Sequence, residues 1–203
     1  MLIARIPRFL SRTFRSLTWE IPVAGKRVFL TFDDGPTPEV TTWVLKELDR
    51  FHAKATFFCL GNNVEKHPEI YRAILSKGHA VGNHSHSHLK GFRFSVNRYT
   101  EDVEMAALKI HSDLFRPPYG RILPRQVKRL NGKFRIIMWT VLSVDYNRKV
   151  SGEQVVKNVV DNVRPGSIIV FHDSVKASKN LYYALPKVLA HLEKEGYEMR
   201  TIE

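Results

Sequence analysis

Apolar and polar positions alternate along this chain in blocks that predict strands and helices in turn. Short apolar runs without a helical period are typical of buried strands. Such runs lie at residues 26–32, 54–60, 80–82, 134–142, 167–171 and 197–202. Between them, apolar residues recur every three or four positions and predict helices over residues 39–51, 68–78 and 97–114, one that starts at a Ser151–Gln154 capping pattern and reaches Val163, and a last one that ends at Gly196.

This alternation of strands and helices favours a parallel sheet or barrel. No linker, repeat or low-complexity stretch interrupts it, and a length of 203 residues favours a single domain. The composition, with 43% hydrophobic and 26% charged residues, is that of an ordinary globular protein. The only cysteine, Cys59, excludes an internal disulfide and lies in an apolar run, which indicates a buried thiol.

Residues 1–22 stand apart as a basic, amphipathic segment that precedes the main domain of residues 23–203. Its apolar residues recur at near-helical spacing beside a row of arginines, although Pro7 interrupts the pattern. No apolar run here reaches the length of a signal-peptide core or a membrane-spanning helix. Two interpretations stay open, a helix docked on the domain or a peripheral contact with an anionic membrane. We therefore expect a cytoplasmic or peripheral inner-membrane location.

The net charge of +12 fits an anionic partner such as an acidic glycan, a membrane surface or nucleic acid, and is equally consistent with a role in solubility. The basic residues after position 20 are scattered, and no stretch interleaves them with aromatic residues. Nucleic acid is therefore not an expected partner.

Two adjacent carboxylates, Asp33 and Asp34, follow the first predicted strand within the segment TFDDGP. The glycine and proline after them end the strand. Folds that alternate strands and helices keep their functional residues at the carboxyl ends of the strands. Two carboxylates this close repel each other unless a cation or a proton lies between them. Taken alone, such a turn is equally consistent with helix capping.

Histidines after the third predicted strand, in the segment HSHSH, supply ligands for such a cation. Their spacing predicts that His84 and His88 lie on one side of a helical turn and that His86 points away. Together with Asp34 they would leave a tetrahedral metal one open position for water, which is typical of a catalytic site. Ser85 stands where the HExxH metalloprotease motif has its glutamate.

The remaining residues of the predicted site move protons. Asp33 is free to act as the general base, and we expect Arg116, in a loop stiffened by two prolines, to pair with it and hold it ionised. That loop also suits the presentation of a backbone N–H to an oxyanion. His172, directly after a buried strand, is placed to act as a general acid, with Asp145 raising its pKa. Taken alone, His172 is equally typical of a hydrogen-bonded core histidine.

These segments resemble the polysaccharide deacetylases, which are carbohydrate esterase family 4 or the NodB homology domain. TFDDGP resembles the first family motif and HSHSH the second. RPPY, at residues 116–119, resembles the third motif. VFH, at residues 170–172, resembles the fifth, in which leucine is usual in place of Val170. The resemblance covers about residues 26–200. It implies a distorted (β/α)7 TIM-like barrel, and the metal-dependent removal of N- or O-acetyl groups from a glycan with metal-bound water as nucleophile.

The resemblance also implies individual roles. One divalent metal, zinc or in its place cobalt, nickel or another ion, would be held by Asp34, His84 and His88. The catalytic set would comprise Asp33 as base, Arg116 to orient it, His172 as acid, Asp145 to tune it, and Tyr119 as the backbone donor to the oxyanion. We expect the substrate to contact Pro118, Tyr146 and Val170.

The fourth motif departs from the family pattern D-x-x-D-W. Leu142 replaces its first aspartate and Tyr146 its tryptophan, while Asp145 is kept. The changed aromatic residue alters the wall around the acetyl methyl group, so substrate preference is more affected than catalysis.

Two other functions stay open: hydrolysis of a non-peptide C–N bond in a small cyclic substrate, and non-catalytic binding of a glycan or of the cell envelope. The presence of all three metal ligands argues against the first, and the presence of Asp33 and His172 argues against the second. The identity of the glycan, the choice between N- and O-acetyl groups and the oligomeric state are left open by the sequence.

Overall fold

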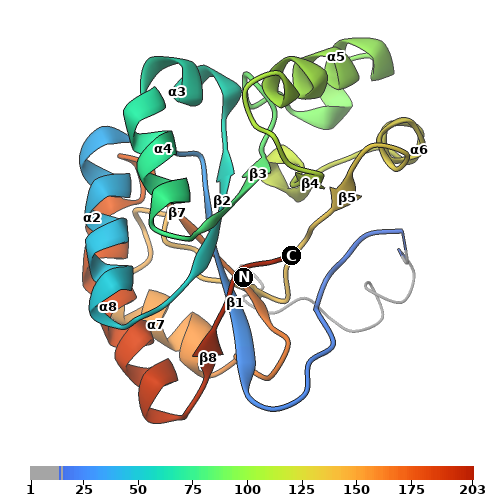
Figure 1. Ribbon diagram of the computed structural model, residues 1–203. Helices are drawn as coiled ribbons and strands as arrows, with labels where there is room; N and C mark the ends of the chain where they lie inside the picture. Colours follow the sequence, from blue (N-terminus) through green and yellow to red (C-terminus); the bar gives the residue numbers. More distant parts are fainter. Residues whose placement is uncertain (1–13, 15) are drawn as a thin grey trace.

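Parallel strands curl around the centre of the protein into an open, distorted barrel, seen in the computed structural model of Figure 1, which describes residue 14 and residues 16–203. The sheet order is β5-β4-β3-β2-β1-β7-β6, with β8 paired to β1. The predicted single-domain (β/α)7 barrel is thereby confirmed. The strands are β1 (Arg27–Asp33), β2 (Ala55–Cys59), β3 (Ala80–Asn83), β4 (Leu114–Phe115), β5 (Arg135–Ile136), β6 (Val141–Leu142), β7 (Ile168–His172) and β8 (Glu198–Met199).

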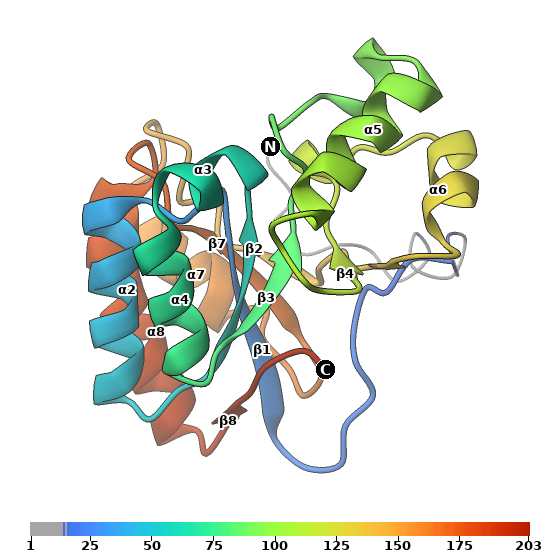
Figure 2. The same ribbon diagram turned by 45° about the horizontal axis from the view of Figure 1, so that its top comes forward.

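Helices connect successive strands and cover the outside of the sheet. In Figure 2, α2, α4, α7 and α8 lie on one side of the molecule, whereas α5 and α6 lie beside the short strands on the other side. The helices are α2 (Pro38–Arg50), α3 (Gly61–Lys66), α4 (Pro68–Ser76), α5 (Val96–Ala107), α6 (Pro124–Leu130), α7 (Gly152–Val160) and α8 (Ser178–Lys194), with short 3-10 turns η1 (Gly91–Arg93) and η2 (Pro118–Gly120). No helix among the described residues has the length and apolar character needed to cross a membrane.

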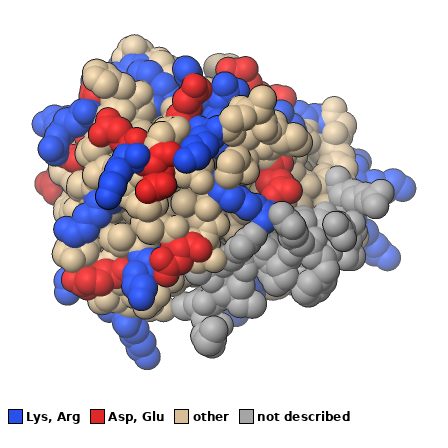
Figure 3. Space-filling model, turned by 90° about the horizontal axis from the view of Figure 1, so that it is seen from below, with Lys and Arg blue, Asp and Glu red and all other residues tan. Residues whose placement is uncertain are grey.

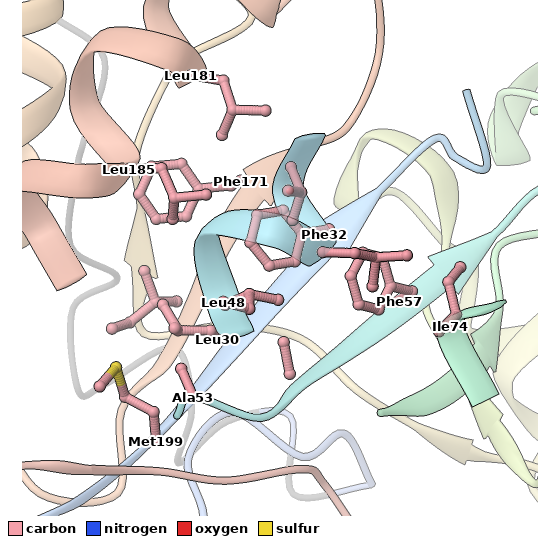
Figure 4. Packing of buried hydrophobic residues seen from close by; sticks show 14 of the residues in the cluster. Leu30, Phe32, Leu48, Ala53, Phe57, Ile74, Phe171, Leu181, Leu185 and Met199 are labelled. Atoms are coloured by element: carbon pink, nitrogen blue, oxygen red, sulfur yellow. The ribbon is translucent and has the colours of Figure 1, made fainter. Parts of the chain in front are cut away.

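The central strand β1 divides its side chains between two layers, because successive residues of a strand point to opposite faces. Leu30 and Phe32 pack in the main core between the sheet and its helices (Figure 4). Phe29 packs in a second cluster with residues of β2, β4 and β7, and Thr31 and Asp33 bind the same buried arginine. This alternation places the side chain of Asp33 inside the barrel.

The prediction of one continuous strand over residues 134–142 is wrong for the middle of this range. It is split into β5 and β6, and the chain between them does not continue the strand. The carbonyls of Ile137 and Met138 accept hydrogen bonds from the Arg116 guanidinium, at 3.2 and 3.1 Å. These carbonyls therefore bind the buried guanidinium inside the barrel instead of a neighbouring strand.

The predicted helix at residues 97–114 is too long, because α5 ends at Ala107 and Leu114 begins strand β4. The segment between them turns back towards the sheet, where the backbone N–H of Leu114 donates to the Ser112 hydroxyl at 3.1 Å. Ile110 and Leu114 fit the helical period because both are buried, but different elements bury them.

The amphipathic segment predicted at residues 1–22 falls largely outside the described residues. Its last part is bound to the barrel. The Thr18 N–H donates to the Ile136 carbonyl at 2.8 Å, the Met138 N–H donates to the Thr18 carbonyl at 2.7 Å, and the Ile21 N–H donates to the Gly166 carbonyl at 3.1 Å. Residues 18–21 thus connect the chain at the end of β5 with the turn before β7. The boundary at residue 23 and the membrane contact stay predictions.

Candidate active site

Polar residues from several strand ends meet in a cavity of about 600 Å³ at one end of the barrel. β1 and β7 are neighbours and pair in register, with Asp33 opposite His172. The cavity is lined by Asp33, Asp34, His84, His88, Lys90, Tyr119, Gly120, Arg121, Trp139, Leu142, Tyr146, Val170, His172 and Lys176. The topology therefore brings together segments that are far apart in the sequence.

Asp33 is held by a fully buried arginine. The Arg116 Nη1 atom donates to Asp33 Oδ1 at 2.6 Å and to the Thr31 hydroxyl at 2.7 Å. The guanidinium also lies 4.0 Å from the centre of the Phe58 ring. Arg116 has no exposed surface, so the carboxylate of Asp33 compensates a charge that would otherwise be buried alone.

Asp34, His84 and His88, from the loops after β1 and β3, form a second group in the cavity. The Asp34 Oδ1 atom lies 3.7 Å from His84 Nε2 and 3.3 Å from His88 Nε2. Their ligand atoms all lie within 4.8 Å of one another, close enough to bind one metal ion. Asp34 Oδ1 is buried and has no hydrogen-bond partner among the described residues. A buried carboxylate oxygen without a partner is costly, and a cation among these three ligands would remove that cost.

The ionisation of these ligands suits a metal. Burial would raise the pKa of Asp34, but the facing imidazoles of His88, His172 and His84 hold this pKa well below its usual range. Burial lowers the pKa of His84 to about 4, so its ring is neutral at neutral pH. His84 Nδ1 lies 2.8 Å from the Arg116 carbonyl, which leaves Nε2 as the ligand atom. Metals need deprotonated ligands with this kind of second hydrogen bond.

The histidines lie in a loop, so the predicted helical turn is wrong. Ser85 and His88 both adopt left-handed backbone conformations, with φ angles of 68° and 57°. The His88 N–H donates to the Ser85 hydroxyl at 3.0 Å, and the N–H groups of His86 and Ser87 donate to Asp102 Oδ2 at 3.1 and 3.0 Å. The loop brings the two ligands together as a helical turn would. His86 does not join them, as predicted.

The turn after β1 depends on residues that the sequence did not single out. Asp34 has a φ of 82°, and Gly35 precedes a cis proline. The Gly35 N–H donates to Asp173 Oδ1 at 3.0 Å, and the Thr41 hydroxyl donates to Asp173 Oδ2 at 2.5 Å. A side chain at Gly35 would collide with the Asp173 carboxyl group, which explains a glycine at this position.

The half-buried His172 and the buried Asp145 form a pair at the end of β7. His172 Nδ1 lies 2.8 Å from Asp145 Oδ1, and the His172 backbone N–H donates to Asp145 Oδ2 at 2.8 Å. Burial would lower the pKa of His172, but Asp145 above all, with Asp34 and Asp33, raises it to about 9. An imidazole held in this way is charged at neutral pH and has Nε2 free to donate a proton.

The remaining predicted residues differ in their access to the cavity. Tyr146 and Val170 line it, and the Tyr146 ring meets the His172 ring edge-on with 4.9 Å between centres. The Tyr119 ring is 51% exposed and packs against His88 with 4.5 Å between ring centres. Pro118 is buried and does not line the cavity.

Sequence reasoning missed five residues that line this cavity: Lys90, Gly120, Arg121, Trp139 and Lys176. Trp139 was assigned to a continuous strand, where it had no distinct role. The three basic residues come shortly after motif segments in the sequence: Lys90 after the metal-ligand loop, Arg121 after the Arg116 loop and Lys176 after β7. This short distance from the motifs could have indicated that they line the cavity.

Comparisons with known proteins agree with this architecture. A family model described as polysaccharide deacetylase matches residues 20–133. Two peptidoglycan-N-acetylglucosamine deacetylases of Bacillus cereus are 35% and 32% identical to this chain. The first match covers 89% of this chain and 68% of the relative, and the second covers 92% and 91%.

A crystal structure shares the fold. It is that of the Bc1960 peptidoglycan N-acetylglucosamine deacetylase, which is 32% identical and matches with a TM-score of 0.85 over 97% of this chain and 94% of that chain. The sequence comparison and the structure comparison thus lead to relatives of the same description. The chain therefore belongs to the polysaccharide deacetylase family, carbohydrate esterase family 4.

Proposed function

We propose that this protein removes N-acetyl groups from a peptidoglycan-type glycan in a zinc-dependent hydrolysis. The observation that carries the proposal is the Asp34 Oδ1 atom, which faces the Nε2 atoms of His84 and His88 and has no hydrogen-bond partner within residues 16–203, with Asp33 and His172 in the same cavity. The family supplies the reaction class, and the names of the Bacillus cereus relatives suggest the glycan and the N-acetyl group.

The donor set fits zinc. Two imidazole nitrogens and one carboxylate oxygen are ligands that zinc accepts in catalytic sites, although cobalt and nickel accept them as well. Bound there, the ion would supply a Lewis acid for the acetyl carbonyl and lower the pKa of a water molecule. The loop fastened by Asp102 and the His84–Arg116 hydrogen bond hold the ligands in place for it.

Asp33 takes the proton from the attacking water. Arg116 binds its Oδ1 atom, and Oδ2 accepts no hydrogen bond from the described residues. Oδ2 is thus available to the water. Arg116, fully buried beside the carboxylate, compensates its charge and holds it in place.

His172 gives a proton to the leaving group. Its Nδ1 is engaged by Asp145, which orients the ring and leaves Nε2 as the donor. The water oxygen bonds to the acetyl carbon, the C–N bond breaks, and the sugar nitrogen leaves as an amine with the proton from His172. Acetate is the other product. We expect the Tyr119 backbone N–H to stabilise the oxyanion, as the family motif implies.

Acetate release from a panel of acetylated oligosaccharides tests the proposal. The protein is stripped with a chelator, divided, and reloaded with zinc, cobalt or nickel, and bound metal is measured in each sample. We expect the stripped protein to be inactive and zinc to restore acetate release from N-acetylglucosamine-containing peptidoglycan fragments. One bound metal per chain without acetate from any peptidoglycan fragment would overturn the proposal.

A further inference from the structure

A second hollow adjoins the catalytic cavity. It has a volume of about 780 Å³ and lies between the start of α7, the loop before it and the start of α8. Lys176 borders both hollows. Its Nζ atom lies 5.5 Å from the centre of the Tyr146 ring, which contacts His172. We call this hollow the basic trough. It is continuous with the side of the cavity that holds the general acid.

Positive charge dominates the basic trough. Its charged lining residues are Arg148, Lys149, Lys176, Lys179 and, as the only acid, Glu153. Arg148, Lys149, Lys176 and Lys179 are exposed, and within residues 16–203 none of them lies within ion-pair distance of a carboxylate. Four cations against one acid attract anions to a concave surface.

The opposite end of the barrel is different. Lysines and arginines there lie beside acidic side chains (Figure 3). Arg27 pairs with Glu198 at 3.4 Å, and Lys77 pairs with Asp49. Arg27 and Lys77 at that end are thus compensated by acidic neighbours, whereas the four cations of the basic trough have no carboxylate of residues 16–203 within ion-pair distance.

The basic trough is preformed. Asn180, which is 93% buried, donates from Nδ2 to the carbonyls of Asp145, Asn147 and Val150, at 3.0, 3.3 and 3.1 Å. This one amide fastens the loop that carries Arg148 and Lys149. The same loop begins at Asp145, the partner of the general acid, so the basic trough and His172 are held in a fixed relation.

We propose that the basic trough binds an anionic group, a carboxylate or a phosphate, carried by the glycan next to the acetylated sugar. This inference rests on the proposed function and narrows its substrate class. The sugar nitrogen must lie at His172 to receive a proton, so substituents on its neighbour fall towards Lys176 and the trough. A neutral glycan such as an N-acetylglucosamine homopolymer offers nothing to these cations, whereas a peptidoglycan strand carries carboxylates.

Calorimetric binding separates this inference from catalysis. The zinc-loaded Asp33→Asn protein, in which loss of the base slows turnover, is compared with the same protein that also carries Arg148→Glu and Lys179→Glu. The ligands are an oligosaccharide of alternating N-acetylglucosamine and N-acetylmuramic acid, the same oligosaccharide with its carboxylates amidated, and a neutral oligosaccharide bearing one phosphate monoester. A matched control carries Lys128→Glu and Arg129→Glu on α6, which lies on the other side of the barrel.

We expect the two charge-reversing substitutions in the basic trough to weaken binding of at least one anionic ligand by roughly 5- to 30-fold. The affinity for the amidated ligand should not change. The anion whose affinity falls identifies the source, carboxylate or phosphate. The α6 control should bind all ligands as the parent does. Equal affinity for charged and amidated ligands, or equal loss in the trough variant and the α6 control, would overturn the inference. Neither result bears on whether the native enzyme releases acetate.

Discussion

The two sides of the catalytic cavity are stabilised in different ways. On one side, Asp34 and His88 have left-handed backbones in the loops after β1 and β3, and Asp34 Oδ1 has no hydrogen-bond partner among the described residues. On the other side, His172 ends a regular strand and shares two contacts of 2.8 Å with Asp145. Between the two sides lies the buried ion pair of Asp33 and Arg116, in which each charge likewise has a protein partner.

The difference separates charged groups that find their partners within the protein from those that need a bound ion. The proton-transfer groups balance their charges within the fold, whereas the metal ligands present a carboxylate oxygen that no donor in the described part of the chain satisfies. The metal side should therefore depend on an added ion, and the proton-transfer side should keep its geometry without it. Substitutions that affect one side alone test this division.

The largest effect is expected from His84→Ala. The change removes one of three metal ligands, so metal binding should fall below one ion per chain and acetate release should drop by more than about 10³-fold. Metal analysis and acetate release on the same sample check this. His111→Ala, at an exposed position, is the matched control. Full metal content in the His84 variant would contradict the ligand assignment.

The next largest effect is a loss of stability in Arg116→Met. The substitution leaves Asp33 buried without its cation and the Ile137 and Met138 carbonyls without their donor. Breaking a buried pair in this way costs about 3–5 kcal/mol of the free energy of unfolding. Urea denaturation measures it. A loss below about 1 kcal/mol, the range of surface ion pairs, would show that this pair does not hold the barrel interior together.

Asp145→Asn should change the pH dependence of catalysis. The pKa of His172 is raised to about 9, so in the native enzyme the imidazolium persists through neutral pH and is lost as the pH rises through this value. Without the Asp145 charge the pKa falls towards its ordinary value of 6.5. The alkaline limb of the kcat/KM profile should move to lower pH, and activity at pH 8 should fall about 10- to 100-fold.

The same variant has a stability counterpart. A pKa raised by folding contributes stability that is full below 6.5 and disappears as the pH rises through about 9. Asp145→Asn should therefore destabilise the protein more at pH 6 than at pH 10. An equal loss at both pH values would mean that Asp145 acts by packing and not by charge.

The smallest effect is expected from Tyr146→Trp, which restores the family residue. Tyr146 lies edge-on to His172 and half-exposed in the cavity wall, so a larger ring changes the fit of the substrate without touching the metal side. We expect less than about a tenfold change in kcat/KM, with a changed preference among acetylated oligosaccharides. A loss of bound metal in this variant would contradict the separation of the two sides.

The strand ends that carry chemistry could be predicted because each joins an apolar run to a polar motif. β1 with Asp33 and β7 with His172 are continuous buried strands, and their carboxyl ends meet by topology. The pairing of Arg116 with Asp33 was predicted from the opposite charges of the two groups and from the stiff double-proline loop, and the two side chains do pair at 2.6 Å.

Other features depend on contacts between distant residues, which no local pattern reports. Arg116 takes the carbonyls that a strand at residues 137–138 would have used. The histidine loop is shaped by Asp102, on a helix beyond the loop. The turn at Gly35 is held by Asp173, 138 residues later, and Trp139 and Lys176 reach the cavity only through the curl of the sheet.

The most direct test of the central claim is a paired measurement on Asp33→Asn, with bound zinc and acetate release determined on one sample and compared with the native protein. The substitution keeps the size of the side chain and removes the base, while Asp34, His84 and His88 are unchanged. We expect one zinc per chain in both proteins and a loss of about 10²- to 10⁴-fold in acetate release from the variant alone. Loss of zinc together with activity, or activity at the native level, would contradict the division between the metal side and the proton-transfer side.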